Sequence, residues 1–399
     1  IRYPTGVRGL LYFQPQISPI PEEHHETKWV ADQAIDFIDT FHSFPFFCFA
    51  SWMQPHWPVH VPKSWANMYS IEDMEEPVWS EAEQAHLPFS TQMGRVASGM
   101  ADPGTPPAMQ RMLRSKALYY ASISFIDYQI GRILERLEHH NLLDNTLIAL
   151  TADHGEMLFD HLSTGKVVAY DPSVRVPFIV SGPGMKGAGT VSDDFVSHQD
   201  FAPTVYEHTG ITPPEGTPLV GASVLGDRPE VRERDAAFCE LGDGAHGGFV
   251  CIRTDKWKYA FYHQGGLRQL FDLENDPHEL ENLLLKEPET YEATAAALHQ
   301  RLLQWSKEHS VNSRIVDGDF AAIDERPIPP DRNNQTDRFE NNLNAPEAAR
   351  LWSEARSVYE AIKDEPYLDP ADLDLEFWER KKGEGSIAEL ERLLGRALR

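Results

Sequence analysis

A short apolar run with polar residues directly behind it is the sequence feature that most restricts the fold. Residues 146–151 read TLIALT, and the group Asp153-His154-Gly155-Glu156 follows at once. A run of this length and character is typical of a central parallel strand that is covered on both faces. Residues 112–141, just before it, place apolar side chains at helical spacing. This helix-strand unit predicts an α/β fold with a mostly parallel central sheet.

The same pattern occurs nearer the amino end. Residues 28–40 predict a helix, and residues 45–52, PFFCFASW, predict a buried strand. The strand has to stop at Gln54-Pro55-His56-Trp57-Pro58, because two prolines cannot continue a central ladder. His56 should therefore lie on a loop at the carboxyl edge of the sheet, where open α/β folds bind ligands. Residues 60–108 lack a sustained period and predict an irregular excursion over the surface.

Composition divides the chain into unequal parts. Residues 1–215 are assigned to the α/β domain, which includes a further predicted strand at 176–181. Residues 216–310 contain short β-rich runs separated by turn residues and then a helical pattern, so they predict a small antiparallel α+β subdomain. Residues 311–399 are assigned to a polar linker or arm and a helical C-terminal extension, with helical patterns around 345–362 and 386–398.

Charge and composition exclude several classes of partner. Asp and Glu number 62 against 36 Lys and Arg, which gives a formal net charge of −26. A surface of this sign repels phosphate backbones and anionic lipid, so neither nucleic acid nor a membrane is an expected partner. No stretch of the sequence approaches the roughly 20 apolar residues that a membrane span needs.

The cysteines indicate no disulfide framework. Cys48, Cys239 and Cys251 are an odd number and stand in no CxxC or zinc-site spacing. Cys48 lies inside an apolar run, so we expect it in the core. So few cysteines fit the cytoplasm or periplasm of a bacterium, and the compartment stays undetermined.

Candidate chemistry is carried by His56, Lys166 and the pair Asp153-His154. A carboxylate and an imidazole at the end of a strand suit a cation, but two ligands are too few for a metal site. Asp153 could equally cap a helical turn that begins at Gly155. Taken alone, His56 and Lys166 are more often ordinary surface residues than catalysts. The individual residues leave these alternatives open.

Taken together and in order, these groups resemble the sulfatase family of the alkaline-phosphatase-like superfamily. The segments that carry the resemblance include PFFCFASWMQPHWP, NTLIALTADHGEMLFDH, STGKVVAYDPSVRVPFIVSGPG and IRTDKWKYAFYHQGGLRQLFDLENDPHELENL. The resemblance covers about residues 28–308 and implies an alkaline-phosphatase-like sandwich with a small C-terminal antiparallel sheet. Residues 310–399 match nothing general in the family.

The resemblance implies a role for each candidate. Asp153 and His154 correspond to ligands of the family's divalent cation. Lys166 corresponds to the lysine that contacts the sulfate or phosphate oxygens, and His56 to the histidine near the bridging oxygen of the ester. A histidine after the Asp, where many arylsulfatases have Asn, is similar to the branch with phosphonate monoester hydrolases. Because imidazole suits transition metals better than Ca²⁺, the expected ion is either Mn²⁺ or Ca²⁺. His161 is expected to be structural rather than to line the pocket.

One part of the family pattern is not found in the sequence. The family nucleophile is a formylglycine made from Cys or Ser in the motif C/S-x-P-S/A-R, and no Cys or Ser of this chain stands in it. The Asp pair that supplies the other metal ligands is not found either. The sequence therefore looks like the C-terminal portion of a sulfatase, with the formylglycine expected in a missing N-terminal segment.

The expected activity is metal-dependent hydrolysis of sulfate esters, with little activity from this chain alone. Two alternatives stay open: hydrolysis of phosphonate monoesters or phosphodiesters, and a catalytically incomplete fragment. The expected partner is a small sulfated or phosphorylated ester. The C-terminal extension is a candidate for holding copies together in a homo-oligomer.

Overall fold

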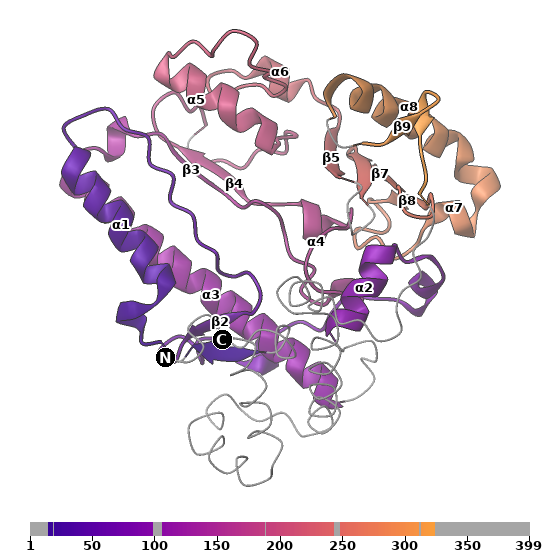
Figure 1. Ribbon diagram of the computed structural model, residues 1–399, viewed down its shortest axis with the longest axis horizontal. Helices are drawn as coiled ribbons and strands as arrows, with labels where there is room; N and C mark the ends of the chain where they lie inside the picture. Colours follow the sequence, from indigo (N-terminus) through magenta and orange to yellow (C-terminus); the bar gives the residue numbers. More distant parts are fainter. Residues whose placement is uncertain are drawn as a thin grey trace, which may run out of the picture.

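The computed structural model describes residues 15–18, 20–98, 106–187, 189–242, 248–310 and 313–323 (Figure 1). The helices are α1 (Glu26–Phe41), α2 (Phe89–Ser98), α3 (Pro106–His139), α4 (Asp171–Val174), α5 (Phe201–Thr209), α6 (Pro229–Arg232), α7 (Leu283–Lys286) and α8 (Pro288–His309). The strands are β1 (Gln16–Ser18), β2 (His60–Pro62), β3 (Ile148–Thr151), β4 (Phe178–Ser181), β5 (Ala237–Leu241), β6 (Phe249–Arg253), β7 (Trp257–Tyr262), β8 (Arg268–Asp272), β9 (Ile315–Val316) and β10 (Asp319–Phe320). Short 3-10 helices η1 (Glu22–His24), η2 (Ile71–Asp73), η3 (Glu81–His86), η4 (Leu143–Asn145), η5 (Asp160–Leu162) and η6 (His198–Asp200) lie between them.

Two long helices flank one side of the molecule. α1 and α3 lie side by side, and the Arg132 guanidinium of α3 donates to the Asp32 carboxylate of α1 at 2.7 Å (Figure 1). The helices predicted over residues 28–40 and 112–141 are therefore confirmed. None of the described helices is long and apolar enough to cross a lipid bilayer.

The predicted mostly parallel central sheet is wrong for the described residues. β3 and β4 are antiparallel, with Ile148 opposite Ser181. Within that part of the chain the parallel pair is β1 with β2, which is short and separate. An apolar run predicts a strand but not its direction. A parallel partner needs a crossover, usually a long helix, and the described connection from β3 to β4 contains only η5 and α4.

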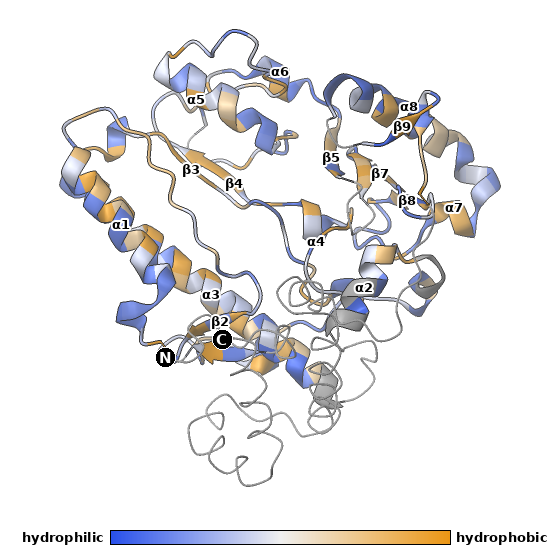
Figure 2. Cartoon of the chain, in the orientation of Figure 1, coloured by the Kyte–Doolittle hydropathy of each residue, from blue (hydrophilic) through white to orange (hydrophobic). Residues whose placement is uncertain are grey.

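Within the described residues, the strands β3 and β4 are covered on one face only. Phe178 and Val180 pack against a cluster built around Val231, whereas Ile179 on the opposite face is 61% exposed. Both strands are strongly apolar along their length, as Figure 2 shows. The described residues thus do not bury both faces as expected, because hydropathy alone does not reveal which face has a cover.

The strand predicted at residues 45–52 is absent from the described structure. The segment runs as extended chain from the end of α1 towards β2, outside any described sheet (Figure 1). Its large side chains are exposed, among them Phe47 and Phe49, and Cys48 is exposed rather than buried. The apolar composition was interpreted as a buried strand, but among the described residues no neighbouring strand pairs with this segment.

A four-stranded antiparallel sheet, in the order β5-β6-β7-β8, forms the C-terminal part of the described fold (Figure 1). One face packs against α7 and α8 through a core that includes Ile252, Tyr259 and Leu302. The other face packs against residues 168–174 through Cys251, Ala260 and Tyr262. The sheet is thus covered by helices on one side and by the chain preceding β4 on the other.

The predicted extension does not begin as a simple linker. β9 and β10 form a small hairpin, Phe320 joins the core beside α8, and the Ile323 N–H donates to the His263 carbonyl at 2.7 Å. This stretch therefore packs on the subdomain. The helical patterns around 345–362 and 386–398, and most of the predicted linker, lie outside the described residues, and the domain boundaries stay a prediction.

An ion pair is buried between the sheet and the segment that packs on it. The Lys258 ammonium on β7, 1% exposed, lies 2.6 Å from Asp171 and 2.7 Å from Glu279. Burial opposes its charge, but the two carboxylates raise its pKa above the ordinary value. Glu279 also accepts from the Asp171 N–H at 2.6 Å. The interaction fixes α4 against the sheet.

We predict that Lys258→Ala lowers the free energy of unfolding by about 3–5 kcal/mol, because it leaves Glu279 buried without its counter-charge and Asp171 with only the longer contact to Arg253. Urea denaturation monitored by Trp fluorescence measures this value. Lys256→Ala is the matched control: Lys256 is solvent-exposed and pairs with Asp272 and Glu274 at the surface, so little change is expected. Equal, small effects of both substitutions would contradict the prediction.

Candidate functional site

The polar group after β3 forms an open turn. Asp153 is 86% exposed and its Oδ1 accepts the His154 N–H at 3.0 Å. In the described chain no helix starts here, so Asp153 is not a helix cap. The turn therefore presents the Asp153 carboxylate to solvent beside the half-buried His154 imidazole.

The tautomer of His154 follows from its contacts. Its Nδ1 lies 2.7 Å from the Gly155 carbonyl oxygen, which can only accept, so Nδ1 carries the proton. In the neutral ring Nε2 then presents a lone pair, and it lies 3.4 Å from Asp153 Oδ2. Two lone-pair atoms this close are compatible when a proton or a cation lies between them. Donation from the second ring nitrogen to a backbone carbonyl is the usual support of a metal-binding histidine.

His56 is oriented in the same way. Its Nδ1 lies 2.7 Å from the Trp57 carbonyl oxygen, and its Nε2 lies 2.9 Å from the Lys166 ammonium. Because an ammonium only donates, His56 Nε2 is the acceptor in this contact. The structure thus brings together two residues that are 110 positions apart in the chain.

The two imidazoles lie in one neighbourhood. The ring centroids of His56 and His154 are 6.5 Å apart, with their planes at 65°. Three groups therefore lie close together near the end of β3: the positively charged Lys166, the neutral His56 imidazole and the Asp153-His154 turn. Such an arrangement can bind a tetrahedral anion through the charge of Lys166, and an imidazole beside the anion can transfer a proton.

The loop that carries Lys166, residues 157–167, has an unusual backbone. Non-glycine residues in the left-handed region are concentrated here: Leu158, Phe159, His161, Leu162 and Val167. Such backbone is costly for bulky side chains and persists only where surrounding contacts impose it. The loop is closed by the Met157 N–H donating to the Gly165 carbonyl at 2.8 Å.

Glu156 supplies part of that constraint. Glu156 is half-buried, and its carboxylate accepts from the backbone N–H groups of Leu158 and Gly165. Burial raises its pKa above the ordinary value, against these hydrogen bonds and the nearby Lys166 charge. The residue next to Lys166 is thus tied to the turn that follows β3.

Gly155 allows the turn to pack closely on α4. A Cβ at this position would lie 2.0 Å from the Pro172 carbonyl oxygen, and the Gly155 N–H donates to the Ser173 carbonyl at 2.8 Å. Any side chain here would push the turn away from α4. The glycine of Asp153-His154-Gly155-Glu156 is therefore required by backbone contact.

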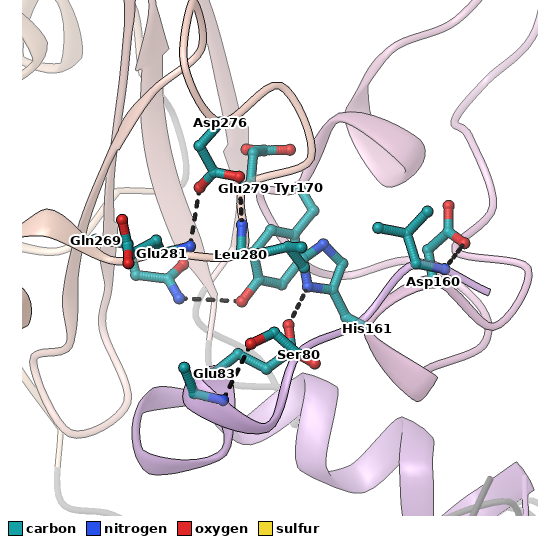
Figure 3. A network of polar contacts seen from close by, with 12 residues as sticks. Ser80, Glu83, Asp160, His161, Tyr170, Gln269, Asp276, Glu279, Leu280 and Glu281 are labelled. Carbon is teal, nitrogen blue, oxygen red and sulfur yellow. Dashed lines mark hydrogen bonds and ion pairs between the residues drawn. The ribbon is translucent and has the colours of Figure 1, made fainter.

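His161 has a structural position. It is buried, its Nδ1 lies 2.7 Å from a Glu83 carboxylate oxygen, and its ring stacks on Tyr170 at 3.9 Å (Figure 3). Arg95 binds both the His161 carbonyl and Glu83. The network continues from Tyr170 to Gln269 of β8, as Figure 3 shows. The expectation that His161 is structural agrees with these contacts.

This network corrects the interpretation of residues 60–108. These residues contain η3 and α2. Glu83 and Arg95 contact each other and His161 of the Lys166 loop, so the described part of this stretch belongs to the fold. Glu83, Arg95 and the role of Glu156 were missed from the sequence. An apolar period is too weak in this stretch to reveal them, and only the proximity of Glu156 to Asp153 offered a signal.

No group of three or more His, Cys, Asp or Glu residues able to hold a metal ion occurs within the described ranges. Asp153 and His154 fit a cation by donor type and by the support of the imidazole, but they form only part of a ligand set.

We predict that Glu156→Ala loosens the Lys166 loop. It removes the acceptor of the half-buried Leu158 and Gly165 N–H groups, at a cost of up to about 1–3 kcal/mol each. Hydrogen exchange at residues 157–166 should become about 10-fold faster or more, with unchanged exchange in β6 and β7. Glu138→Ala, on the exposed surface of α3, is the control. Unaltered exchange in the loop would show that Glu156 does not hold it.

Family models match most of the described chain. A model described as Sulfatase matches residues 8–211, and one described as N-sulphoglucosamine sulphohydrolase, C-terminal, matches residues 159–308. The second match spans the Lys166 loop and the antiparallel sheet, so both parts of the fold fall within these models.

Relatives and solved structures agree. An arylsulfatase of Clostridium perfringens is 34% identical over 67% of this chain and 55% of its own length, and human arylsulfatase K is 28% identical over 68% and 53%. The chain thus spans about half the length of these curated relatives. The phosphonate monoester hydrolase from Silicibacter pomeroyi superposes with a TM-score of 0.64 at 22% identity, covering 81% of this chain and 71% of that one. The Agrobacterium radiobacter enzyme of the same name gives 0.63 at 25% identity, covering 82% and 69%.

Proposed function

Because the chain belongs to the sulfatase family, we propose that it serves the metal-dependent hydrolysis of sulfate esters. The observation that carries the proposal is the 2.9 Å contact between Lys166 Nζ and His56 Nε2 beside the Asp153-His154 turn. A cation and an imidazole held in contact next to candidate metal ligands suit a small dianionic or monoanionic ester. The names of the arylsulfatase relatives support sulfate as the anion.

Asp153 and His154 would hold the divalent cation, with Asp153 Oδ2 and His154 Nε2 as the donor atoms. When bound, such an ion polarises an ester oxygen and lowers the cost of charge that develops there. Mn²⁺ and Ca²⁺ are the candidate ions, and the imidazole favours a transition metal. Further ligands and the formylglycine nucleophile would come from sequence beyond the motifs in this chain.

Lys166 would neutralise the ester oxygens that are already charged in the ground state. His56 would act on the leaving oxygen, whose charge appears only as the bond breaks. In its protonated form the ring carries an N–H at both nitrogens, so it would deliver the Nε2 proton and return to the neutral ring that accepts from Lys166. Its Nδ1–H bond to the Trp57 carbonyl would hold the ring in place during that transfer. The two residues share one contact, so each also orients the other.

Hydrolysis of phosphonate monoesters or phosphodiesters is the second candidate. Two observations favour it: a histidine follows Asp153, and the structures reported above carry the name phosphonate monoester hydrolase. Both anions are tetrahedral and suit the same donors. A substrate panel of aryl sulfates, phosphodiesters and phosphonate monoesters discriminates between them.

A catalytically incomplete fragment is the third reading. The two-donor metal group and the unmatched formylglycine motif support it, and it implies little turnover by residues 1–399 alone. The C-terminal extension remains a candidate for self-association, and it lies largely outside the described residues.

We predict that Asp153→Ala and His154→Ala each weaken Mn²⁺ binding by about 10-fold or more, because each removes a ligand. Free Mn²⁺ is measured by its electron paramagnetic resonance signal in titrations of the 399-residue chain. Asp144→Ala, at the exposed η4 turn, is the matched control and should leave binding unchanged. Unchanged binding in Asp153→Ala would show that the metal group is assigned wrongly.

We predict different kinetic effects for the two catalytic candidates, measured on the product of the complete reading frame that encodes this chain. Lys166→Ala should raise KM and lower kcat. His56→Ala should mainly lower kcat, by about 10²–10⁴-fold, and less for esters with acidic leaving groups such as nitrophenol.

The 2.9 Å contact sharpens this test, because neighbours in contact are not additive. The double variant should lose less activity than the product of the two single losses. Lys186→Ala, an exposed lysine paired with Asp227, is the control. Equal loss for good and poor leaving groups in His56→Ala would exclude a proton donor at this position.

A further inference from the structure

Two cysteines outside the candidate site face each other across neighbouring strands. Cys239 lies on β5, and its directly opposed partner on β6 is Cys251. Both side chains pack into the same apolar cluster on one face of the sheet, together with Ala260. Cys251 is buried, Cys239 is half-buried, and both are free thiols.

The spacing of the two residues suits a covalent bond. Directly opposed residues in antiparallel strands have Cα atoms about 4.5–5.5 Å apart. Disulfide-bonded cysteines have Cα atoms about 4.4–6.8 Å apart. Both side chains also lie on the same face of the sheet, in one cluster. The register of the two strands therefore places this pair within the Cα range of a disulfide.

The surroundings make the two thiols unequal. The hydrogen bond from Cys251 and the positive charge of Lys258 lower the pKa of the Cys239 thiol, against the effect of burial. The same hydrogen bond and burial raise the pKa of the Cys251 thiol. Cys239 is also the more exposed of the two. Cys239 is therefore the sulfur that meets a reagent first, and Cys251 stands behind it.

We propose that Cys239 and Cys251 form a reversible intramolecular disulfide when the chain meets a small-molecule disulfide such as oxidised glutathione. The Cys239 thiolate attacks one sulfur of the reagent, which breaks its S–S bond and releases one thiol. Cys251 then loses its proton and attacks the Cys239 sulfur of the mixed disulfide, releasing the second thiol. The protein is oxidised by two electrons and the reagent is reduced by two.

The bond would fasten an edge strand. In its sheet β5 pairs with β6 alone, so the disulfide would add a covalent tie to the outermost strand. It would form next to Lys258, which holds Asp171 and α4 on this face. The thiol pair thus lies where the sheet meets the segment that leads from Lys166.

The test uses the Cys48→Ser chain, because Cys48 is exposed and would react on its own. The folded protein is incubated with oxidised glutathione, denatured, alkylated and weighed by mass spectrometry. The expected product has lost two hydrogens, takes up no alkyl group, and regains two alkylation sites after reduction. A non-reducing peptide map of the unsubstituted 399-residue chain, after the same incubation with oxidised glutathione, should contain the Cys239–Cys251 cross-link.

Removing Cys251 as well provides the control. In Cys48→Ser/Cys251→Ser, Cys239 should retain one glutathione, since no second thiol can displace it. The proposal is overturned if the Cys48→Ser chain keeps glutathione on Cys239, or if both cysteines remain open to alkylation after oxidation. The peptide map decides the same question in the unsubstituted protein if either variant fails to fold.

Discussion

The buried ammonium of Lys258 is the interaction on which the arrangement of the described chain depends. It lies between Asp171 and the buried Glu279, and so offsets the cost of enclosing their charges. Asp171 begins α4, and α4 supplies the backbone on which Gly155 rests. A charge inside the C-terminal sheet thus determines where the turn after β3 lies. The C-terminal sheet and the turn after β3 are thus connected through Lys258, Asp171 and α4.

Backbone atoms, rather than other side chains, set the chemistry of the candidate site. The carbonyls of Trp57 and Gly155 each take the Nδ1 proton of the adjacent histidine. Both imidazoles therefore present Nε2, one to Lys166 and one to Asp153. A local backbone acceptor is a rigid way to fix a tautomer, because it cannot rotate away as a side chain can. The left-handed residues of the Lys166 loop likewise indicate a backbone held in one conformation, here the backbone that carries Lys166.

Much of the local structure was predictable, and the tertiary cover was not. Helical spacing identified α1 and α3, and an apolar run ended by polar residues identified β3 and its turn. The direction of β4 and the exposure of residues 45–52 depend on which segments lie alongside, and hydropathy does not encode that. The family resemblance implied that Lys166 and His56 contact the same ester, but it did not reveal the Glu156 hydrogen bonds that close the Lys166 loop. A carboxylate that binds two backbone N–H groups leaves no periodic signal in the sequence.

The exposed segment after α1 has a consequence for how the chain behaves in solution. The segment exposes aromatic and thioether side chains, namely Phe44, Phe47, Phe49 and Met53. No described strand pairs with its backbone. Such a segment is a template for pairing with another chain. The formal charge of −26 opposes that encounter over distances set by ionic strength. Added salt screens this repulsion but does not change the exposed apolar surface of the segment.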